Sequence, residues 1–112
     1  MSKNYVPNSG DIIWIHFDLA AGSTGQDHKP AVILSPSAYN KKTGLIVCCP
    51  ITDQIKNYPF EVLVGSDQKS AVLADQVKSL DWANTKISHQ GRINSAELAE
   101  VRAKLQALVL KS

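Results

Sequence analysis

The chain has 112 residues, of which 44% are hydrophobic and 20% charged, and a net charge of +2. This composition excludes an intrinsically disordered segment, and the length suits one hydrophobic core, so we expect a single domain spanning residues 1–112. The longest apolar stretch, residues 45–51, is far shorter than the roughly 20 residues of a membrane-spanning helix. Because the first residues also lack the apolar core of a secretion signal, we expect a cytoplasmic protein with no membrane association.

Five short segments rich in β-branched and aromatic residues predict strands. In chain order they are residues 11–17, 31–35, 45–49, 60–64 and 71–74. Between the second and third, residues 36–44 predict a short helix or turn that ends in glycine. Glu61 interrupts the apolar run of the fourth segment, as an outward-facing strand residue would.

The last segment changes to the periodicity of an α-helix, with apolar residues three and four positions apart: Leu98, Val101, Leu105 and Leu108. Asn94 followed three residues later by Glu97 resembles a capping box and predicts the helix start. Several strands followed by one amphipathic helix predict a mainly β protein with helices (α+β), a small curled sheet or open barrel closed by the C-terminal helix.

Most catalytic and metal-binding patterns are missing from the sequence. Cys48 and Cys49 are adjacent, so on a strand they point to opposite faces and are poorly placed to form a disulfide with each other. The three histidines are far apart in sequence, which disfavours a metal site, and we expect neither a metal nor a cofactor. No nucleophile elbow and no phosphate-binding glycine loop occurs.

Three polar segments remain as candidates for function. Residues 22–30 form a glycine-containing loop that leads directly into the strand at 31–35. Pro30 fixes its own φ and favours an extended conformation at Lys29, which holds this cation where the loop meets the sheet. The other two candidates are residues 52–58 and 75–79. Solvated loop lysines and a threonine that completes a turn are the simpler interpretation of the same residues.

Six motifs, in order and spacing, resemble those of the MazF/PemK toxins of bacterial toxin–antitoxin systems. They are Gly10-Asp11, Lys29-Pro30-Ala31-Val32, Ala38-Tyr39-Asn40, Pro50-Ile51-Thr52, Tyr58-Pro59-Phe60-Glu61-Val62 and Leu73-Ala74-Asp75-Gln76-Val77-Lys78-Ser79. The resemblance covers nearly the whole chain. It implies an SH3-like small open barrel, a homodimer, and a metal-independent endoribonuclease that cleaves single-stranded RNA and is neutralised by a cognate antitoxin protein.

The resemblance also implies a mechanism, in which the ribose 2′-OH attacks the adjacent phosphate and leaves 2′,3′-cyclic phosphate and 5′-OH ends. The basic residue before the family's proline and the threonine after its third strand correspond to Lys29 and Thr52, the expected catalytic residues. The expected RNA-binding residues are Ser23, Thr24, Gln26, His28, Lys56, Tyr58, Gln76 and Lys78. Trp14 and Trp82 are expected in the core or at a dimer contact.

Lys29 departs from the family pattern, which usually has arginine at this position. Lysine keeps the charge but loses the planar fork that binds two phosphate oxygens at once. Either Lys29 carries a proton itself, or the enzyme is attenuated. Two further alternatives are a weak or inactive relative that binds RNA or antitoxin, and a gyrase-inhibiting toxin of the same fold. The latter acts through its terminal helix and does not need Lys29 with Thr52.

Overall fold

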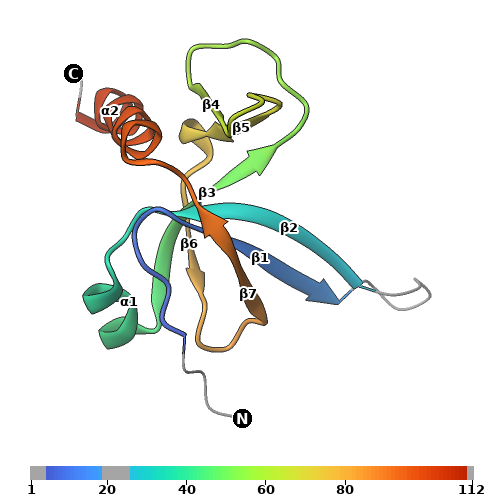
Figure 1. The fold of residues 1–112 in the computed structure, drawn as a ribbon. Coiled ribbons are helices and arrows are strands. Elements are labelled where there is room, and N and C mark those ends of the chain that lie inside the picture. Colours follow the sequence, from blue (N-terminus) through green and yellow to red (C-terminus); the bar gives the residue numbers. More distant parts are fainter. Residues whose placement is uncertain (1–4, 19–25, 111–112) are drawn as a thin grey trace.

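The computed structural model describes residues 5–18 and 26–110, which form an antiparallel sheet with helices packed around it (Figure 1). The strand order in the described part of the chain is β4-β5-β3-β2-β1-β7, and β6 pairs with β3. The strands are β1 Asp11–Asp18, β2 Gln26–Ile33, β3 Leu45–Thr52, β4 Glu61–Val64, β5 Ser70–Leu73, β6 Lys78–Asp81 and β7 Ile87–Arg92. The helices are α1 Ser37–Thr43, the 3-10 turn η1 Ala74–Gln76, and α2 Ser95–Leu110.

Strand β3 lies at the centre of the sheet and pairs with three neighbours. It pairs with β6 through residues 45–48, with β2 through residues 48–50 and with β5 through residues 51–52. Its successive side chains alternate between two hydrophobic clusters, because neighbouring residues on a strand point to opposite faces. Cys49 belongs to one cluster, whereas Ile46 and Cys48 belong to the other.

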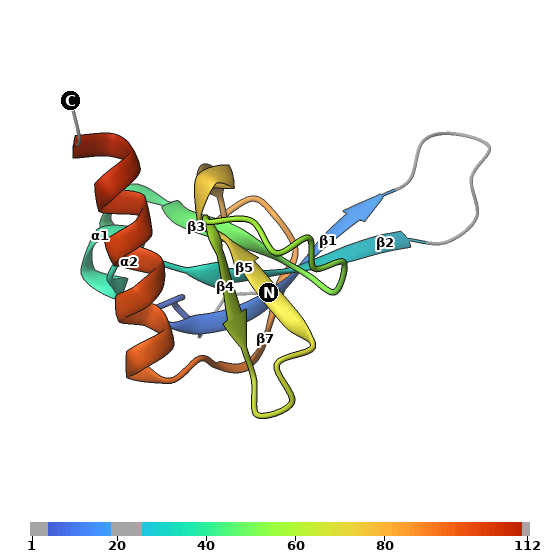
Figure 2. The same cartoon turned by 90° about the horizontal axis from the view of Figure 1, so that it is seen from above.

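The two clusters form separate halves of the core. The first cluster includes Val101 of α2 and lies where this helix covers β4 and η1; its other buried members include Val32, Val62, Val64, Val72 and Ile93. The second cluster contains Ile13, Ile15, Ile33, Ile46 and Trp82. The β1–β2 hairpin projects away from α2 (Figure 2). Trp82 is buried and donates its Nε1–H to the Asn40 carbonyl oxygen at 2.9 Å, so the core position expected for Trp82 is confirmed.

The five predicted strands and the C-terminal helix are all present, but β6 and β7 were not predicted. Both missed strands carry mostly polar residues that are exposed or half-buried. Their pairing with β3 and β1 stabilises them, and this pairing leaves little hydrophobic pattern in the sequence.

Strand β2 begins at Gln26, five residues before the predicted start. Lys29 and Pro30 therefore belong to a strand and not to a loop. Pairing with β3 starts only at Ala31, so residues 26–30 have a strand neighbour on one side, β1. A proline is tolerated in such an edge position because a missing N–H there breaks no internal ladder.

Both predicted helix-end signals are confirmed. Helix α1 ends at Gly44, whose φ of 74° is left-handed and whose N–H donates to the Asn40 carbonyl oxygen. At the start of α2, the Glu97 N–H donates to Asn94 Oδ1 at 2.7 Å, and the Asn94 N–H donates to Glu97 Oε1 at 3.0 Å. The second carboxylate oxygen of Glu97 accepts the N–H of Gly65, which lies in the turn between β4 and β5.

The prediction that Glu61 faces outward is wrong. The residue is only 9% exposed, although it is charged. Its carboxylate turns toward the loop that precedes β4 and accepts two backbone hydrogen bonds there. These bonds supply the partners that a buried carboxylate requires.

A second buried carboxylate, that of Asp11, fastens the N-terminal segment to the sheet. Asp11 is 4% exposed and accepts hydrogen bonds from the Tyr5 hydroxyl at 2.6 Å and from the Asn8 N–H at 3.0 Å. It also pairs with the guanidinium of Arg92 at the end of β7. Burial, together with the hydrogen bond to Asp11, raises the pKa of Tyr5 well above its ordinary value.

Both cysteines are free and buried, as expected from their adjacent positions. Burial raises the pKa of the Cys48 thiol, and it raises the pKa of the Cys49 thiol to about 12. In the described part of the chain, no helix is both long enough and apolar enough to cross a membrane.

The free energy of unfolding should fall as the pH rises above about 9, by up to about 1.4 kcal/mol per pH unit from Cys49. The pKa of this thiol is 9.0 before folding and about 12 in the folded protein. Between these values the folded state binds more protons at Cys49. The contribution of this thiol to the free energy of unfolding is therefore complete below pH 9.0 and is lost toward about pH 12. Urea unfolding across this pH range measures the slope. A Cys49→Ala variant with the same slope would contradict the assignment.

Candidate functional site

A polar pocket of about 450 Å³ opens where the loop after β3 faces η1. It is lined by Thr52, Gln54, Lys56, Tyr58, Glu61, Leu73 and Gln76. Four of these residues, Thr52, Lys56, Tyr58 and Gln76, were predicted as site residues from sequence. The fold therefore brings together two of the candidate segments, although they are about twenty residues apart in the chain.

Thr52 is the last residue of β3 and lies opposite Ala71 of β5. Its Oγ1 accepts the N–H of Gln54 at 3.0 Å, which fixes the first turn of the loop. A hydroxyl is both an acceptor and a donor, so Thr52 can hold this turn and still donate its own hydrogen to a group in the pocket.

Tyr58 lies half-buried at the wall of the polar pocket, and its position is set by η1. Its hydroxyl donates to Asp75 Oδ1 at 2.7 Å. This hydrogen bond is the largest cause that raises the pKa of Tyr58 to about 12. Near neutral pH the side chain is an uncharged phenol, as it would be at its ordinary pKa, and it presents an aromatic face and an acceptor oxygen to the pocket that Gln76 also lines.

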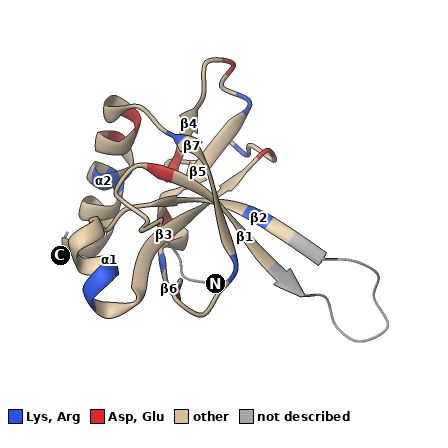
Figure 3. Ribbon diagram, turned by 60° about the horizontal axis from the view of Figure 1, so that its bottom comes forward, with Lys and Arg blue, Asp and Glu red and all other residues tan. Residues whose placement is uncertain are grey.

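Lys29 is exposed on β2 and lies opposite Ile15 of β1. Figure 3 colours lysine and arginine positions blue, and a blue segment lies on β2. The antiparallel pairing of β2 with β3 ends at Ala31 and Pro50. Continued by two residues, the same register sets Lys29 opposite Thr52, and opposite residues on antiparallel strands face the same side. The cation and the hydroxyl thus share one face of the sheet, at the point where β2 and β3 separate.

Lys29 itself does not line the polar pocket, and neither do the remaining predicted residues. Ser23 and Thr24 lie outside the described residues, as does the side chain of Gln26. His28 neighbours Lys29 on β2 and therefore points to the opposite face, where its ring lies 4.4 Å from that of Trp14. Lys78 is exposed on β6, opposite Cys48, and does not line the pocket.

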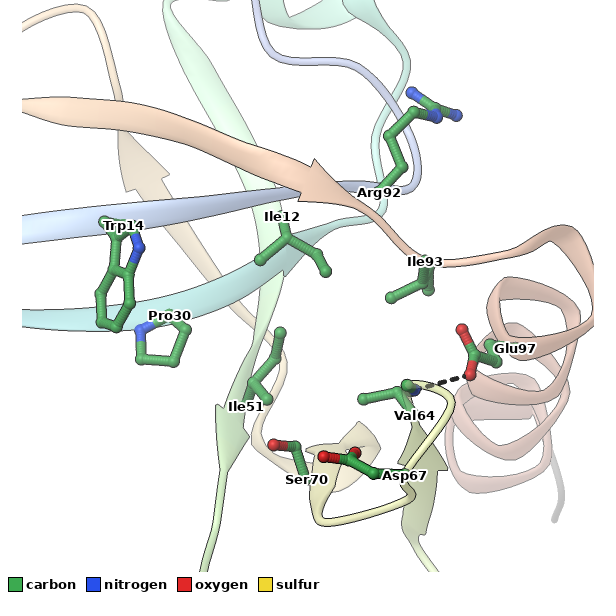
Figure 4. A pocket seen from close by; sticks show the side chains of 11 residues that line it. Ile12, Trp14, Pro30, Ile51, Val64, Asp67, Ser70, Arg92, Ile93 and Glu97 are labelled. Atoms are coloured by element: carbon green, nitrogen blue, oxygen red, sulfur yellow. Dashed lines mark hydrogen bonds between the residues drawn. The ribbon is translucent and has the colours of Figure 1, made fainter.

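An apolar pocket of about 350 Å³ lies on this opposite face (Figure 4). Its apolar wall is made by Ile12, Trp14, Pro30, Ile51 and Val64, and charged side chains of Asp67, Arg92 and Glu97 lie around it. Trp14 is half-buried here and belongs to neither core cluster. This pocket was not predicted from the sequence, although the alternation of β1 already separates Ile12 and Trp14 from the core residues Ile13 and Ile15.

Glu61 and Asp75 both hold the loop between β3 and β4 through hydrogen bonds, and neither contact was predicted from the sequence. The sequence does single out Glu61, because it is a charged residue within an apolar strand. That pattern does not show whether the side chain points to solvent or back into the loop. Within residues 5–18 and 26–110, no group of three or more histidine, cysteine, aspartate or glutamate side chains is arranged to hold a metal ion.

Comparison with known proteins gives a consistent result over the whole fold. Residues 8–109 match the family described as PemK-like, MazF-like toxin of type II toxin–antitoxin system. The chain is 44% identical over 110 residues to the endoribonuclease toxin MazF of Escherichia coli K12, covering 97% of this chain and 99% of that protein.

Solved structures of similar sequence share the fold. A MazE–MazF structure from Deinococcus radiodurans superposes with a TM-score of 0.86 at 40% identity, covering 97% of this chain and 100% of that one. A structure of MazF from the same organism gives a TM-score of 0.81 at 41% identity, covering 95% and 98% of the two chains. The seven strands and the C-terminal helix described above are therefore those of a known fold.

Proposed function

Because this chain belongs to the PemK-like, MazF-like toxins of type II toxin–antitoxin systems, we propose that it is an endoribonuclease that cleaves single-stranded RNA at its polar pocket. The observation that best supports the assignment is that Thr52, Lys56, Tyr58 and Gln76 line one polar pocket. Lys29 does not line it, but the β2–β3 register, continued by two residues, puts Lys29 on the same face of the sheet as Thr52. The substrate is messenger RNA, and the toxin acts on it in the cytoplasm.

The reaction is an internal transfer within the RNA. The 2′-oxygen attacks the adjacent phosphorus while its proton is removed, and the bond from phosphorus to the 5′-oxygen breaks as that oxygen takes up a proton. The products are a 2′,3′-cyclic phosphate and a 5′-OH. The transition state carries extra negative charge on the phosphate oxygens, which the Lys29 ammonium and the Thr52 hydroxyl stabilise without a metal ion.

The rest of the polar pocket binds the neighbouring nucleotides. Lys56 supplies a charge for a phosphate, while Tyr58 and Gln76 offer a stacking face and an amide for a base. Lys78 lies outside this pocket, and it extends the RNA path along the surface. His28 points to the opposite face of the sheet, against Trp14, and takes no part in this path.

We propose that a cognate antitoxin inhibits the enzyme by covering this surface. A related MazF from Deinococcus radiodurans has been solved together with MazE. An extended segment with acidic and apolar side chains would suit the exposed Lys29 and Lys56, and such a segment can fold as it binds.

We also propose that two copies associate through α2. An apolar groove of about 470 Å³ runs beside the C-terminal half of this helix, lined by Leu34, Ser35, Val47, Arg102, Leu105, Gln106, Val109 and Leu110. Val109 is 65% exposed and Leu110 is 70% exposed in the isolated chain. Contiguous apolar surface of this kind marks an interaction site, and a homodimer would cover it.

The assignment is tested by incubating the purified protein with a long single-stranded RNA in excess EDTA and mapping the new 5′ ends. Discrete cuts with 5′-OH ends and 2′,3′-cyclic phosphates are expected. An intact transcript, or cleavage only after a divalent metal is restored, would contradict the proposed chemistry.

Replacement of Thr52 by valine should lower kcat about 10²- to 10³-fold, because one hydrogen-bond donor to the transition state is lost. KM for a short RNA should stay within about threefold, since the shape of the pocket is kept. Thr52→Ser retains the hydroxyl and is the matched control. If Thr52→Ser were as slow as Thr52→Val, the hydroxyl would not be the active group.

Replacement of Lys29 by arginine should raise kcat about ten- to a hundredfold, because the guanidinium can bind two phosphate oxygens together. Single-turnover cleavage of a defined RNA measures the change, and Lys29→Gln, which lacks the charge, should be nearly inactive. An unchanged or lower rate for Lys29→Arg would contradict attenuation and would favour the alternative in which Lys29 itself carries a proton.

Replacement of Val109 by aspartate should convert the dimer to a monomer, because a charge would be buried in an apolar contact. Light scattering after size exclusion measures the mass. Ala103→Asp adds the same charge to an exposed part of the same helix that does not line the groove, and it should remain dimeric. A monomeric wild type would refute the dimer.

A further inference from the structure

The loop between β3 and β4, residues 53–60, has no regular secondary structure and yet forms much of the polar pocket. Gln54, Lys56 and Tyr58 all come from it. A loop without strand or helix hydrogen bonds samples many conformations unless other contacts fix it. The conformational entropy that such a loop loses when it binds RNA lowers the affinity. The shape of the pocket therefore depends on what holds this loop.

Glu61 is the first residue after the loop, and its carboxylate is directed back into the loop. Glu61 Oε2 accepts the N–H of Lys56 at 2.8 Å, and Oε1 accepts the N–H of Asn57 at 2.7 Å. The two donors are consecutive in the chain, so one side chain fixes the orientation of two adjacent peptide groups. Charge-assisted hydrogen bonds of this length are the stronger kind.

The backbone of the loop is shaped to meet this carboxylate. Asn57 has a φ of 59°, in the left-handed region that few residues adopt without cost and that asparagine tolerates better than most. This conformation turns the chain between Lys56 and Tyr58, so that the Lys56 side chain and the Tyr58 ring both reach the polar pocket.

Two further contacts hold the loop beyond Asn57. The Tyr58 hydroxyl donates to Asp75 Oδ1, and Lys104 of α2 donates to the carbonyl oxygen of Pro59. Glu61 is the contact that acts on the middle of the loop. A valine or isoleucine at position 61 would satisfy the strand, but it could not bind two amides.

We propose that Glu61 is a positioning residue for RNA binding: it holds residues 56–58 in the conformation that presents Lys56 and Tyr58 to the substrate. This inference rests on the proposed function of the polar pocket. Glu61 also lines the pocket, but each of its carboxylate oxygens accepts a backbone N–H of the loop, and the role assigned to it here is to position that loop.

The test compares Glu61→Gln with Asp11→Asn. Both changes convert a buried carboxylate that accepts at least two hydrogen bonds into an amide of the same shape. The glutamine amide has only one acceptor oxygen, and its NH₂ group cannot accept a hydrogen bond. One of the two loop N–H groups, that of Lys56 or that of Asn57, therefore loses its hydrogen bond. Asp11 lies on β1 and Glu61 on β4, near opposite ends of the strand order. The control variant Asp11→Asn should therefore lower the free energy of unfolding in a similar way, while it leaves the hydrogen bonds of residues 53–60 intact.

Initial rates on a short RNA are measured at a temperature well below the unfolding midpoints of all the proteins. For Glu61→Gln we expect KM to rise about tenfold with kcat within about threefold, and faster hydrogen exchange at the Lys56 and Asn57 amides. Asp11→Asn should keep the wild-type KM. An unchanged KM for Glu61→Gln, or an equal rise in Asp11→Asn, would overturn the proposal, and so would a loss confined to kcat.

Two changes at Asn57 test the same idea if Glu61→Gln fails to fold. Asn57→Gly retains the left-handed conformation and should keep KM near the wild-type value, whereas Asn57→Val opposes that conformation and should raise KM as Glu61→Gln does. Equal KM values for the two would refute the role of the loop conformation. Wild-type protein that cleaves no RNA would instead refute the proposed endoribonuclease function. Failure of that function can therefore be distinguished from failure of the positioning role of Glu61.

Discussion

The eight residues of β3 pair with β6, β2 and β5 in turn, while their side chains supply both halves of the core. A strand with partners on both edges and apolar contacts on both faces has almost no freedom to shift, because a slip of one residue would exchange the two sets of side chains. The position of Thr52 at its end is fixed by this constraint. The site is thus built at the end of a strand that pairs with three neighbours.

The candidate site exists because β2 and β3 separate beyond the Ala31–Pro50 pair. Up to this pair the two strands bury their side chains together. Beyond it, the face that carries Ile33 and Ile46 in the core continues outward as Lys29 and Thr52, which can reach a ligand. The opposite face carries Trp14, Pro30 and Ile51 around the apolar pocket. One strand pair therefore forms two chemically different surfaces, and the alternation of side chains keeps them apart.

Hydrophobic pattern was enough to predict β1, β3, β4, β5 and α2, because each buries apolar side chains at a regular period. It could not predict β6 and β7, whose stability comes from backbone pairing, nor the early start of β2. In the site, resemblance to a family indicated Thr52 and Tyr58. The opposite orientations of His28 and Lys29 were not predicted, because both residues were expected in a loop and not in β2. The outward orientation predicted for Glu61 is wrong because a carboxylate can be buried when hydrogen-bond donors are available to it. Here the donors come from an irregular loop, and the periodicity of the sequence does not indicate their positions.

The side chain of Glu97 links two parts of the chain that are more than thirty residues apart. One of its oxygens accepts the Asn94 N–H at the start of α2, and the other accepts the Gly65 N–H in the β4–β5 turn (Figure 4). Each bond orients the carboxylate for the other, so the helix start and the turn gain from forming together. This coupling favours the formation of α2 and the β4–β5 hairpin together. During synthesis, α2 leaves the ribosome after the β4–β5 hairpin, so the hydrogen bond from Gly65 to Glu97 would complete the hairpin only once α2 has formed.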